Sequence, residues 1–89
     1  MWTVYLIRCK DNTLYTGITT DLEARINTHN IGKGAKYTRG RGPVHLVWSQ
    51  KNLTQSHARK REVEIKKLTR AQKSKLTMTF YDPQPLSLD

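Results

Sequence analysis

The fold of this chain is decided by residues 14–29, which read LYTGITTDLEARINTH. The first six of these residues are rich in β-branched and aromatic side chains, which predicts a strand. Thr20-Asp21-Leu22-Glu23 has the form of a capping box, which predicts that a helix begins at Thr20. Gly17 lies inside the strand, where glycine is normally unfavourable. We therefore expect another group to approach the backbone closely there.

One face of this helix, expected from about Asp21 to Asn30, combines apolar and reactive side chains. At about 100° per residue, one stripe contains Leu22, Arg25, Ile26 and His29. A guanidinium and an imidazole therefore share the stripe that should meet the core. This combination is the first indication of a functional site.

The residues before the decisive stretch complete a hairpin. Residues 2–9 read as a strand and residues 10–13 as a turn, so that Tyr5 and Tyr15 lie on paired strands. Side chains alternate between the two faces of a sheet, so both phenols share a face only if Tyr5 stands opposite an odd-numbered residue such as Thr19. A two-residue turn at Asp11-Asn12 would instead place it opposite Ile18. A common site for the two phenols therefore requires an odd number of loop residues or a bulge.

The residues after the decisive stretch predict one more strand and two more helices. Residues 44–50 read as a strand and residues 54–68 as a helix. Thr69-Arg70-Ala71-Gln72 is a second capping box, which opens a helix to about Leu76. The order β-β-α-β-α-α predicts an α+β fold: a small single domain over residues 1–76, with a three-stranded, mainly antiparallel sheet flanked by helices. Residues 77–89, which include Asp82-Pro83-Gln84-Pro85, are expected to form a flexible or surface-draped tail.

The composition limits the class of protein. Eighty-nine residues suit one domain with a modest core. The single cysteine, Cys9, excludes an internal disulfide and a zinc site built on several thiolates. We find no signal peptide and no apolar run long enough to cross a membrane, so we expect a cytoplasmic protein.

The charge points to a polyanionic partner. Sixteen Lys and Arg against seven Asp and Glu give a formal charge of +9 and a sequence pI near 10.1. Such an excess favours nucleic acid ahead of an anionic membrane, the alternative being a soluble basic protein without such a partner. Residues 32–43 hold four of the five glycines, interleaved with basic and aromatic side chains that suit phosphate contact, namely Lys33, Lys36, Tyr37, Arg39 and Arg41. The alternative for this loop is a solvated connection.

A carboxylate lies beside the apolar face of the second helix. Ala58, Ile65 and Leu68 define this face, and Glu62 projects at its edge, whereas Glu64 is on the exposed side and is given no role. A carboxylate in such a place costs free energy unless it is paired or binds a metal. Glu62 is therefore either the partner of an arginine or a metal ligand.

Together these features resemble a known family. The GIY-YIG nuclease domain is matched by Val4-Tyr5-Leu6, Tyr15-Thr16-Gly17, Arg25, His29 and Glu62. The run from Leu14 through residues 33–40 is similar to the small, stand-alone bacterial members, and the resemblance covers residues 1–76. It implies an active site of Tyr5, Tyr15, Gly17, Arg25, His29 and Glu62. Glu62 is implied to bind one Mg²⁺ or Mn²⁺ ion. Where many family nucleases have an asparagine after the glutamate-bearing helix, this chain has Gln72, Lys73 and Ser74.

The residue types suit phosphodiester hydrolysis. Arg25 can clamp two phosphate oxygens through its fork, and Glu62 can hold a Mg²⁺ ion. Tyr5 or Tyr15 is the favoured general base, with His29 relaying its proton or positioning the phosphate, and His29 itself is the competing base. We expect the two helices to present Arg25, His29 and Glu62 to the pocket that holds the tyrosines.

These observations lead to two hypotheses. The first is a Mg²⁺-dependent endonuclease that hydrolyses DNA, favoured over RNA, in repair or recombination. The alternative is a nucleic-acid-binding protein of weak or no catalytic activity that uses the same basic surface. In either case recognition comes from this domain, a homodimer or a partner protein.

Overall fold

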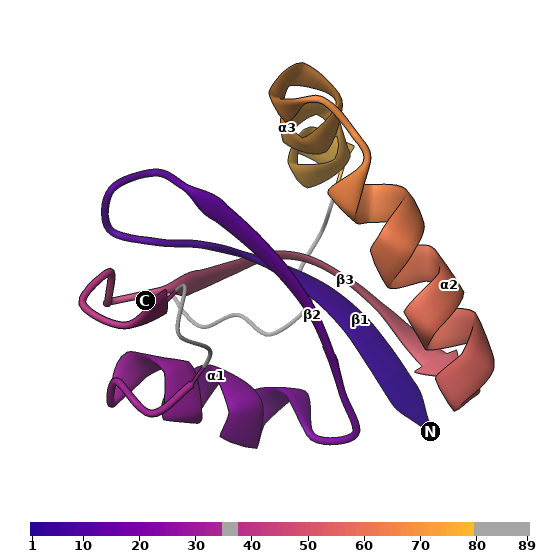
Figure 1. The fold of residues 1–89 in the computed structure, drawn as a ribbon, viewed down its shortest axis with the longest axis horizontal. Helices are drawn as coiled ribbons and strands as arrows, with labels where there is room; N and C mark the ends of the chain where they lie inside the picture. The colour runs from indigo at the N-terminus through magenta and orange to yellow at the C-terminus, as the bar shows by residue number, and fades with distance from the viewer. Residues whose placement is uncertain (35–37, 80–89) are drawn as a thin grey trace.

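The computed structural model describes residues 1–34 and 38–79. Its elements are β1 (Trp2–Arg8), β2 (Leu14–Thr19), α1 (Leu22–Asn30), β3 (His45–Leu53), α2 (Gln55–Lys66) and α3 (Arg70–Thr79). The strands form one sheet in the order β2-β1-β3, and both pairs are antiparallel. Figure 1 shows α1 on one side of the sheet and α2 with α3 on the other. The predicted α+β fold and its order β-β-α-β-α-α are confirmed.

The central strand β1 is buried on both faces, and its alternation divides the core into two layers. Even-numbered Val4 and Leu6 pack with Trp48 of β3 and Ile65 of α2. The other cluster contains Tyr5, Ile7, Cys9 and Val44, against which Leu22 and Ile26 of α1 pack. Tyr5 is thus in the layer under α1.

The hairpin between β1 and β2 has the parity that a shared tyrosine site requires. Tyr5 pairs with Gly17, and Ile7 pairs with Tyr15. The backbone N–H of Cys9 donates to the carbonyl oxygen of Thr13 over 2.8 Å, which closes a loop of residues 10–12. Asn12 has φ 68°, the left-handed residue that a three-residue hairpin loop uses. The odd number of loop residues places both phenols on the face of the sheet that α1 covers. Tyr5 stands opposite Gly17, whereas Thr19 was the example considered from the sequence.

The start of α1 differs by one residue from the prediction. Asp21, not Thr20, is the N-cap, and its Oδ1 accepts from the backbone N–H of Ala24 over 3.2 Å. The backbone N–H of Asp21 in turn donates to Oγ1 of Thr19 over 3.1 Å. Thr19 holds Asp21 in place, and a carboxylate accepts a stronger hydrogen bond from the helix N-terminus than a hydroxyl does.

The second capping box is confirmed. The backbone N–H of Thr69 donates to Oε1 of Gln72 over 2.9 Å, and that of Gln72 donates to Oγ1 of Thr69 over 3.2 Å. The following helix, α3, continues to Thr79, beyond the predicted end near Leu76. Most of the expected tail, residues 80–89, lies outside the described residues. Within the described part of the chain, no helix is both long enough and apolar enough to span a membrane.

Candidate active site

A buried chain of polar side chains lies between the sheet and α1. The hydroxyl of Tyr5 is 2.9 Å from Nε2 of His29, and Nδ1 of His29 is 2.8 Å from Oγ1 of Thr38. These three side chains come from β1, α1 and the segment before β3, and each residue is only 1% exposed. The fold therefore joins three distant positions of the sequence through two direct hydrogen bonds.

Two glycines make room for these hydrogen-bonded side chains. A Cβ atom on Gly17 would lie 2.6 Å from Cζ of Tyr5, and one on Gly34 would lie 2.8 Å from Cγ of His29. Real Cβ contacts are essentially never shorter than 3.0 Å. The group that approaches the backbone of Gly17 is thus the ring of Tyr5.

Tyr15 and Arg25 complete the group on this face. The ring of Tyr15 is centred 6.5 Å from that of Tyr5 and 5.4 Å from that of His29. Tyr15 is partly exposed, whereas Tyr5 is buried. Arg25, one turn before His29 on α1, lies close enough to Tyr5 to oppose the rise that burial causes in the pKa of that phenol. The structure thus brings together four of the residues expected in the site.

Burial keeps the Tyr5 and His29 pair neutral near pH 7. Loss of water around the phenol raises the pKa of Tyr5, an effect that the hydrogen bond and charge of Arg25 oppose and the charges of Tyr15 and Glu62 reinforce. Loss of water also lowers the pKa of His29, and the positive charge of Arg25 lowers it further. Burial disfavours whichever form of a group is charged, so the two pKa values move apart.

Glu62 lies on α2, on the other side of the sheet from α1 (Figure 1). Its carboxylate is 21% exposed and forms an ion pair with Nζ of Lys66 over 3.2 Å. The cation is therefore a lysine one turn along the same helix, not the arginine considered from the sequence. The connection of Glu62 to Tyr5 is electrostatic, because its charge contributes to the raised pKa of that phenol.

The donor set suits a single hard cation with few protein ligands. In residues 1–34 and 38–79, no three His, Cys, Asp or Glu side chains gather in a way that would hold a metal ion. Mg²⁺ commonly uses one or two carboxylates and takes its other ligands from water and substrate phosphates. Glu62 fits that requirement as a sole carboxylate ligand.

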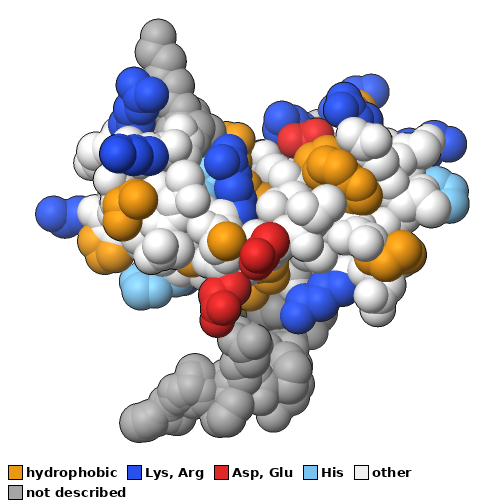
Figure 2. Space-filling model, turned by 90° about the horizontal axis from the view of Figure 1, so that it is seen from below, with side chains coloured by type: hydrophobic (Ala, Val, Ile, Leu, Met, Phe, Trp, Pro, Cys, Tyr) orange, Lys and Arg blue, Asp and Glu red, His pale blue; other side chains and the backbone are white. Residues whose placement is uncertain are grey.

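The basic loop is only partly described. Lys33 and Arg39 are exposed, and Arg41 is ion-paired with Asp11 at the hairpin tip. Lys36 and Tyr37 lie outside the described residues. Figure 2, which views the molecule from the side of α1, shows Lys and Arg side chains at many points and fewer acidic ones.

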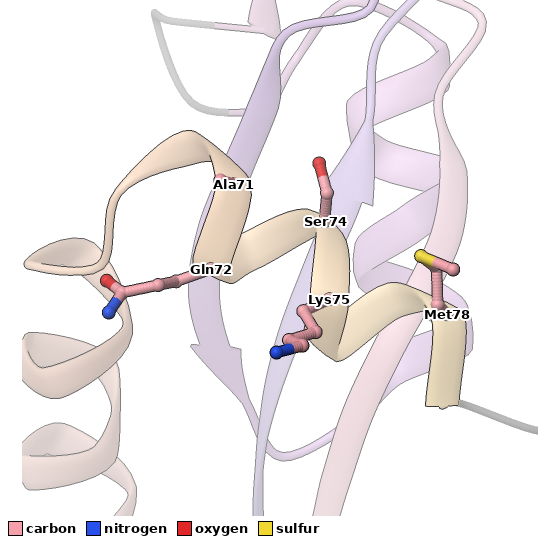
Figure 3. Close-up of a pocket in the computed structure, with 5 residues that line it drawn as sticks. All are labelled: Ala71, Gln72, Ser74, Lys75 and Met78. Atoms are coloured by element: carbon pink, nitrogen blue, oxygen red, sulfur yellow. The ribbon is translucent and has the colours of Figure 1, made fainter.

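Two further features had no role in the sequence analysis. Thr38 is buried against His29, and no sequence pattern distinguishes it from the solvated threonines of other loops. A surface hollow on α3 is lined by Ala71, Gln72, Ser74, Lys75 and Met78 (Figure 3). The hollow is separate from the residues around Tyr5.

The sequence and the fold are similar to those of known proteins. The model of the GIY-YIG catalytic domain family matches residues 1–75. A UPF0213 protein of Staphylococcus haemolyticus is 58% identical over 73 residues, which cover 82% of this chain and 89% of that protein. A UPF0213 protein of Clostridium perfringens is also 58% identical, with 82% and 78% covered. The solution NMR structure of a UPF0213 protein from Bacillus halodurans has a TM-score of 0.59 and 45% identity, with 93% of this chain and 89% of that chain covered.

Proposed function

This chain belongs to the GIY-YIG catalytic domain family, and on that basis we propose that it is a metal-dependent endonuclease that hydrolyses phosphodiester bonds in DNA. The observation that carries the proposal is the grouping of Tyr5, Tyr15 and His29 beneath α1, the helix that also carries Arg25. The formal charge of +9 favours a nucleic acid as substrate. We further propose a cytoplasmic role in DNA repair or recombination, with targeting by a homodimer or a partner protein.

In this mechanism Arg25 stabilises the charge on the phosphoryl group. Its guanidinium has five N–H donors in a planar fork, so it can offer two of them to phosphate oxygens at once. Donors held in place by the fold stabilise developing charge most effectively, and α1 fixes the backbone of Arg25 one turn from His29.

We assign the general base to Tyr15 rather than Tyr5. The Tyr5 hydroxyl is buried and is engaged by His29, and its pKa is raised, which makes the phenolate harder to form. Tyr15 is partly exposed beside the same imidazole. On this assignment Tyr15→Phe abolishes cleavage, whereas Tyr5→Phe slows it and leaves activity measurable. The reverse ranking would overturn the assignment.

Glu62 would hold the metal ion. A bound Mg²⁺ supplies a Lewis acid that polarises a phosphoryl oxygen and stabilises the leaving oxygen. The ammonium group of Lys66, now 3.2 Å from the carboxylate, would have to give up this contact to the ion.

The test uses two glutamates of the same helix. The purified protein is incubated with Mg²⁺ and duplex, single-stranded and branched DNAs. We expect cleavage that Glu62→Gln abolishes and Glu64→Gln leaves unchanged. Glu64 is the matched control, because its side chain is 57% exposed and pairs with Arg61 on the same helix. Equal activity of both variants would exclude Glu62 from the site.

The alternative function is nucleic-acid binding with little or no cleavage. The observation that favours it lies at the start of α3, where many family nucleases have an asparagine. The Gln72 side chain here accepts a hydrogen bond from the backbone of Thr69 and is thereby engaged in capping the helix. Tight DNA binding without cleavage of any substrate in the panel would support this alternative.

A further inference from the structure

The positive charge of the chain is concentrated on one side of the sheet. Residues 59–75, which include most of α2 and of α3, carry eight of the sixteen Lys and Arg but only two of the seven acidic residues. On α1 and its N-cap, by contrast, Asp21 and Glu23 outnumber the single basic residue, Arg25. Since α1 lies on one side of the sheet and α2 with α3 on the other, the two sides differ in charge (Figure 1).

The cations of α2 share one surface of the helix. Arg59 and Lys60 are followed seven residues later by Lys66 and the C-cap residue Lys67, and all four are exposed. Seven residues are about two helical turns, so the second pair lies on the same surface as the first, about 10 Å further along the axis. These four residues are called the basic face of α2 below.

Most of the basic face is not neutralised by the protein itself. Lys66 is ion-paired with Glu62 over 3.2 Å. Within the described part of the chain, no acidic side chain forms an ion pair with Arg59, Lys60 or Lys67. Cations whose charge is not cancelled locally attract a polyanion to the surface that carries them.

The glycine-rich loop after α1 is a weaker candidate for this role. One of its described cations, Arg41, is ion-paired with Asp11 of the hairpin tip. Lys33 and Arg39 are exposed, but neither lies in a helix or strand that would fix the spacing between them. The charges of the basic face, in contrast, are held at a fixed spacing by α2.

We propose that the basic face of α2 is the principal surface by which this protein holds the phosphate backbone of a nucleic acid. The proposal rests on the proposed function in taking nucleic acid as the partner. Each strand of a DNA duplex carries one phosphate per about 3.4 Å of helix axis, so the two pairs of cations are about three phosphates apart. Contacts of this kind position the protein on the backbone and do not read the base sequence.

The basic face borders the carboxylate to which the proposed function assigns the metal ion. Glu62 follows Arg59 by three residues and precedes Lys66 by four, and residues at these spacings are neighbours on a helix surface. The Glu62 side chain is 21% exposed, so groups in solution can reach it. A strand held along the basic face therefore brings phosphates next to Glu62.

An anionic membrane is the competing partner for a cationic helix. Helices that lie on membranes combine a basic face with large apolar side chains that enter the lipid. Val63 is the exposed large apolar residue of α2, at 50% exposure, whereas Ile65 is already packed in the core beneath the helix. The apolar side of α2 is thus occupied by the sheet, which favours nucleic acid.

Lysine footprinting tests the surface in the unaltered protein. The full chain is acetylated with and without a short DNA duplex, in the presence of a chelator that prevents metal-dependent cleavage, and the modified lysines are located by mass spectrometry. We expect DNA to reduce modification of Lys60 and Lys67 about fivefold or more, and that of Lys33 less than about twofold, since a lysine against a phosphate is shielded from the reagent. Protection of Lys33 that equals or exceeds that of Lys60 and Lys67 would overturn the proposal.

Two charge-reversal variants then compare the rival surfaces. Lys60→Glu/Lys67→Glu changes the basic face, and Lys33→Glu/Arg39→Glu changes the loop by the same amount of charge at equally exposed positions. Because each phosphate contact contributes about 0.9 to the slope of log K against log salt, the first variant should lower the slope by about 1.8 and raise the Kd about tenfold or more. The loop variant should change the Kd less than about threefold. A larger loss in the loop variant would overturn the proposal. Circular dichroism checks folding, and Lys60→Gln/Lys67→Gln, with half the change in charge, replaces the first variant if it does not fold.

Binding and cleavage fail separately in these experiments. If DNA binding is lost in the basic-face variant but the unaltered protein cuts nothing, the basic face stands and only the endonuclease fails. If the protein cuts DNA and the basic-face variant binds it normally, the basic face is wrong and the proposed function stands. Vesicles of phosphatidylserine and phosphatidylcholine are the final control. Binding of the unaltered protein to these vesicles but not to DNA would overturn both.

Discussion

The hydroxyl of Tyr5 lies 2.9 Å from Nε2 of His29, although the two residues are 24 positions apart in the chain. The contact forms because β1 directs Tyr5 toward α1, and the buried stripe of α1 directs His29 toward the sheet. Gly17 and Gly34 leave the space that the two rings occupy. The contact between Tyr5 and His29 therefore depends on two glycines, which have no reactive side chain of their own.

Gly17→Ala should destabilise the protein by about 1–3 kcal/mol, the usual cost of overpacking a core. The added methyl group would overlap the ring of Tyr5, which is itself buried between the sheet and α1. Urea unfolding followed by circular dichroism measures the change in the free energy of unfolding. The control is the same substitution in a Tyr5→Leu background, where the smaller side chain should reduce the cost. An equal cost in both backgrounds would show that the strain does not come from Tyr5.

The stability of the protein should fall as the pH drops below about 6.5. In the unfolded chain His29 takes up a proton near its ordinary pKa of 6.5, whereas burial and Arg25 hold the folded pKa below that value. Below pH 6.5 the unfolded state therefore binds more protons, and protonation favours unfolding until the folded pKa is passed. The free energy of unfolding, measured between pH 7.5 and pH 5, should show this loss.

His29→Gln separates this effect from other titrations. The variant should lose less stability than the unaltered protein over the same pH interval, whereas His57→Gln, at an exposed site on α2, should behave like the unaltered protein. If all three proteins lose stability in parallel, another group is responsible.

Features governed by local rules could be predicted from the sequence. The stripe that carries Arg25 and His29 follows from helical periodicity, and the Thr69–Gln72 capping box follows from four adjacent residues. The shared face of the two tyrosines required only the parity of one loop. In each of these cases the interacting groups belong to one element or to one hairpin.

Features that depend on competing local hydrogen bonds, or on contacts between residues far apart in the sequence, could not be predicted from the sequence. Asp21 rather than Thr20 caps α1 because Thr19 also binds the Asp21 backbone, a choice that the capping pattern does not contain. Thr38 appears in the sequence as one more polar residue of a glycine-rich loop. Only the fold places it against His29. For Glu62 the helical spacing showed the edge position, but the ion-pair partner considered from the sequence was an arginine, whereas the structure has Lys66 there.

Binding of nucleic acid should weaken steeply with salt. Lys60 and Lys67 are exposed on α2, and each phosphate that a cation neutralises on duplex DNA adds about −0.9 to the slope of log K against log salt. Lys60→Ala and Lys67→Ala should each reduce the slope by about that amount where the cation contacts a phosphate. Arg61→Ala is the control, because Arg61 stacks over Trp48 and binds Glu64. A slope near zero in the unaltered protein would contradict the inference that its positive charge serves to bind phosphates.

Arg25→Lys should separate cleavage from binding. The substitution keeps the positive charge but replaces a planar fork by a compact ammonium group, which is poorly suited to binding two phosphate oxygens together. Loss of one preorganised donor at developing charge typically costs about 10²–10³-fold in kcat, so we expect a decrease of that size. The dissociation constant for DNA should change only a few-fold, because many other Lys and Arg side chains still attract the backbone. Arg39→Lys, at an exposed position outside the group around Tyr5, is the matched control and should cut normally. If Arg25→Lys also cuts normally, charge alone suffices at this position, and the planar fork of the guanidinium is not needed to stabilise the transition state.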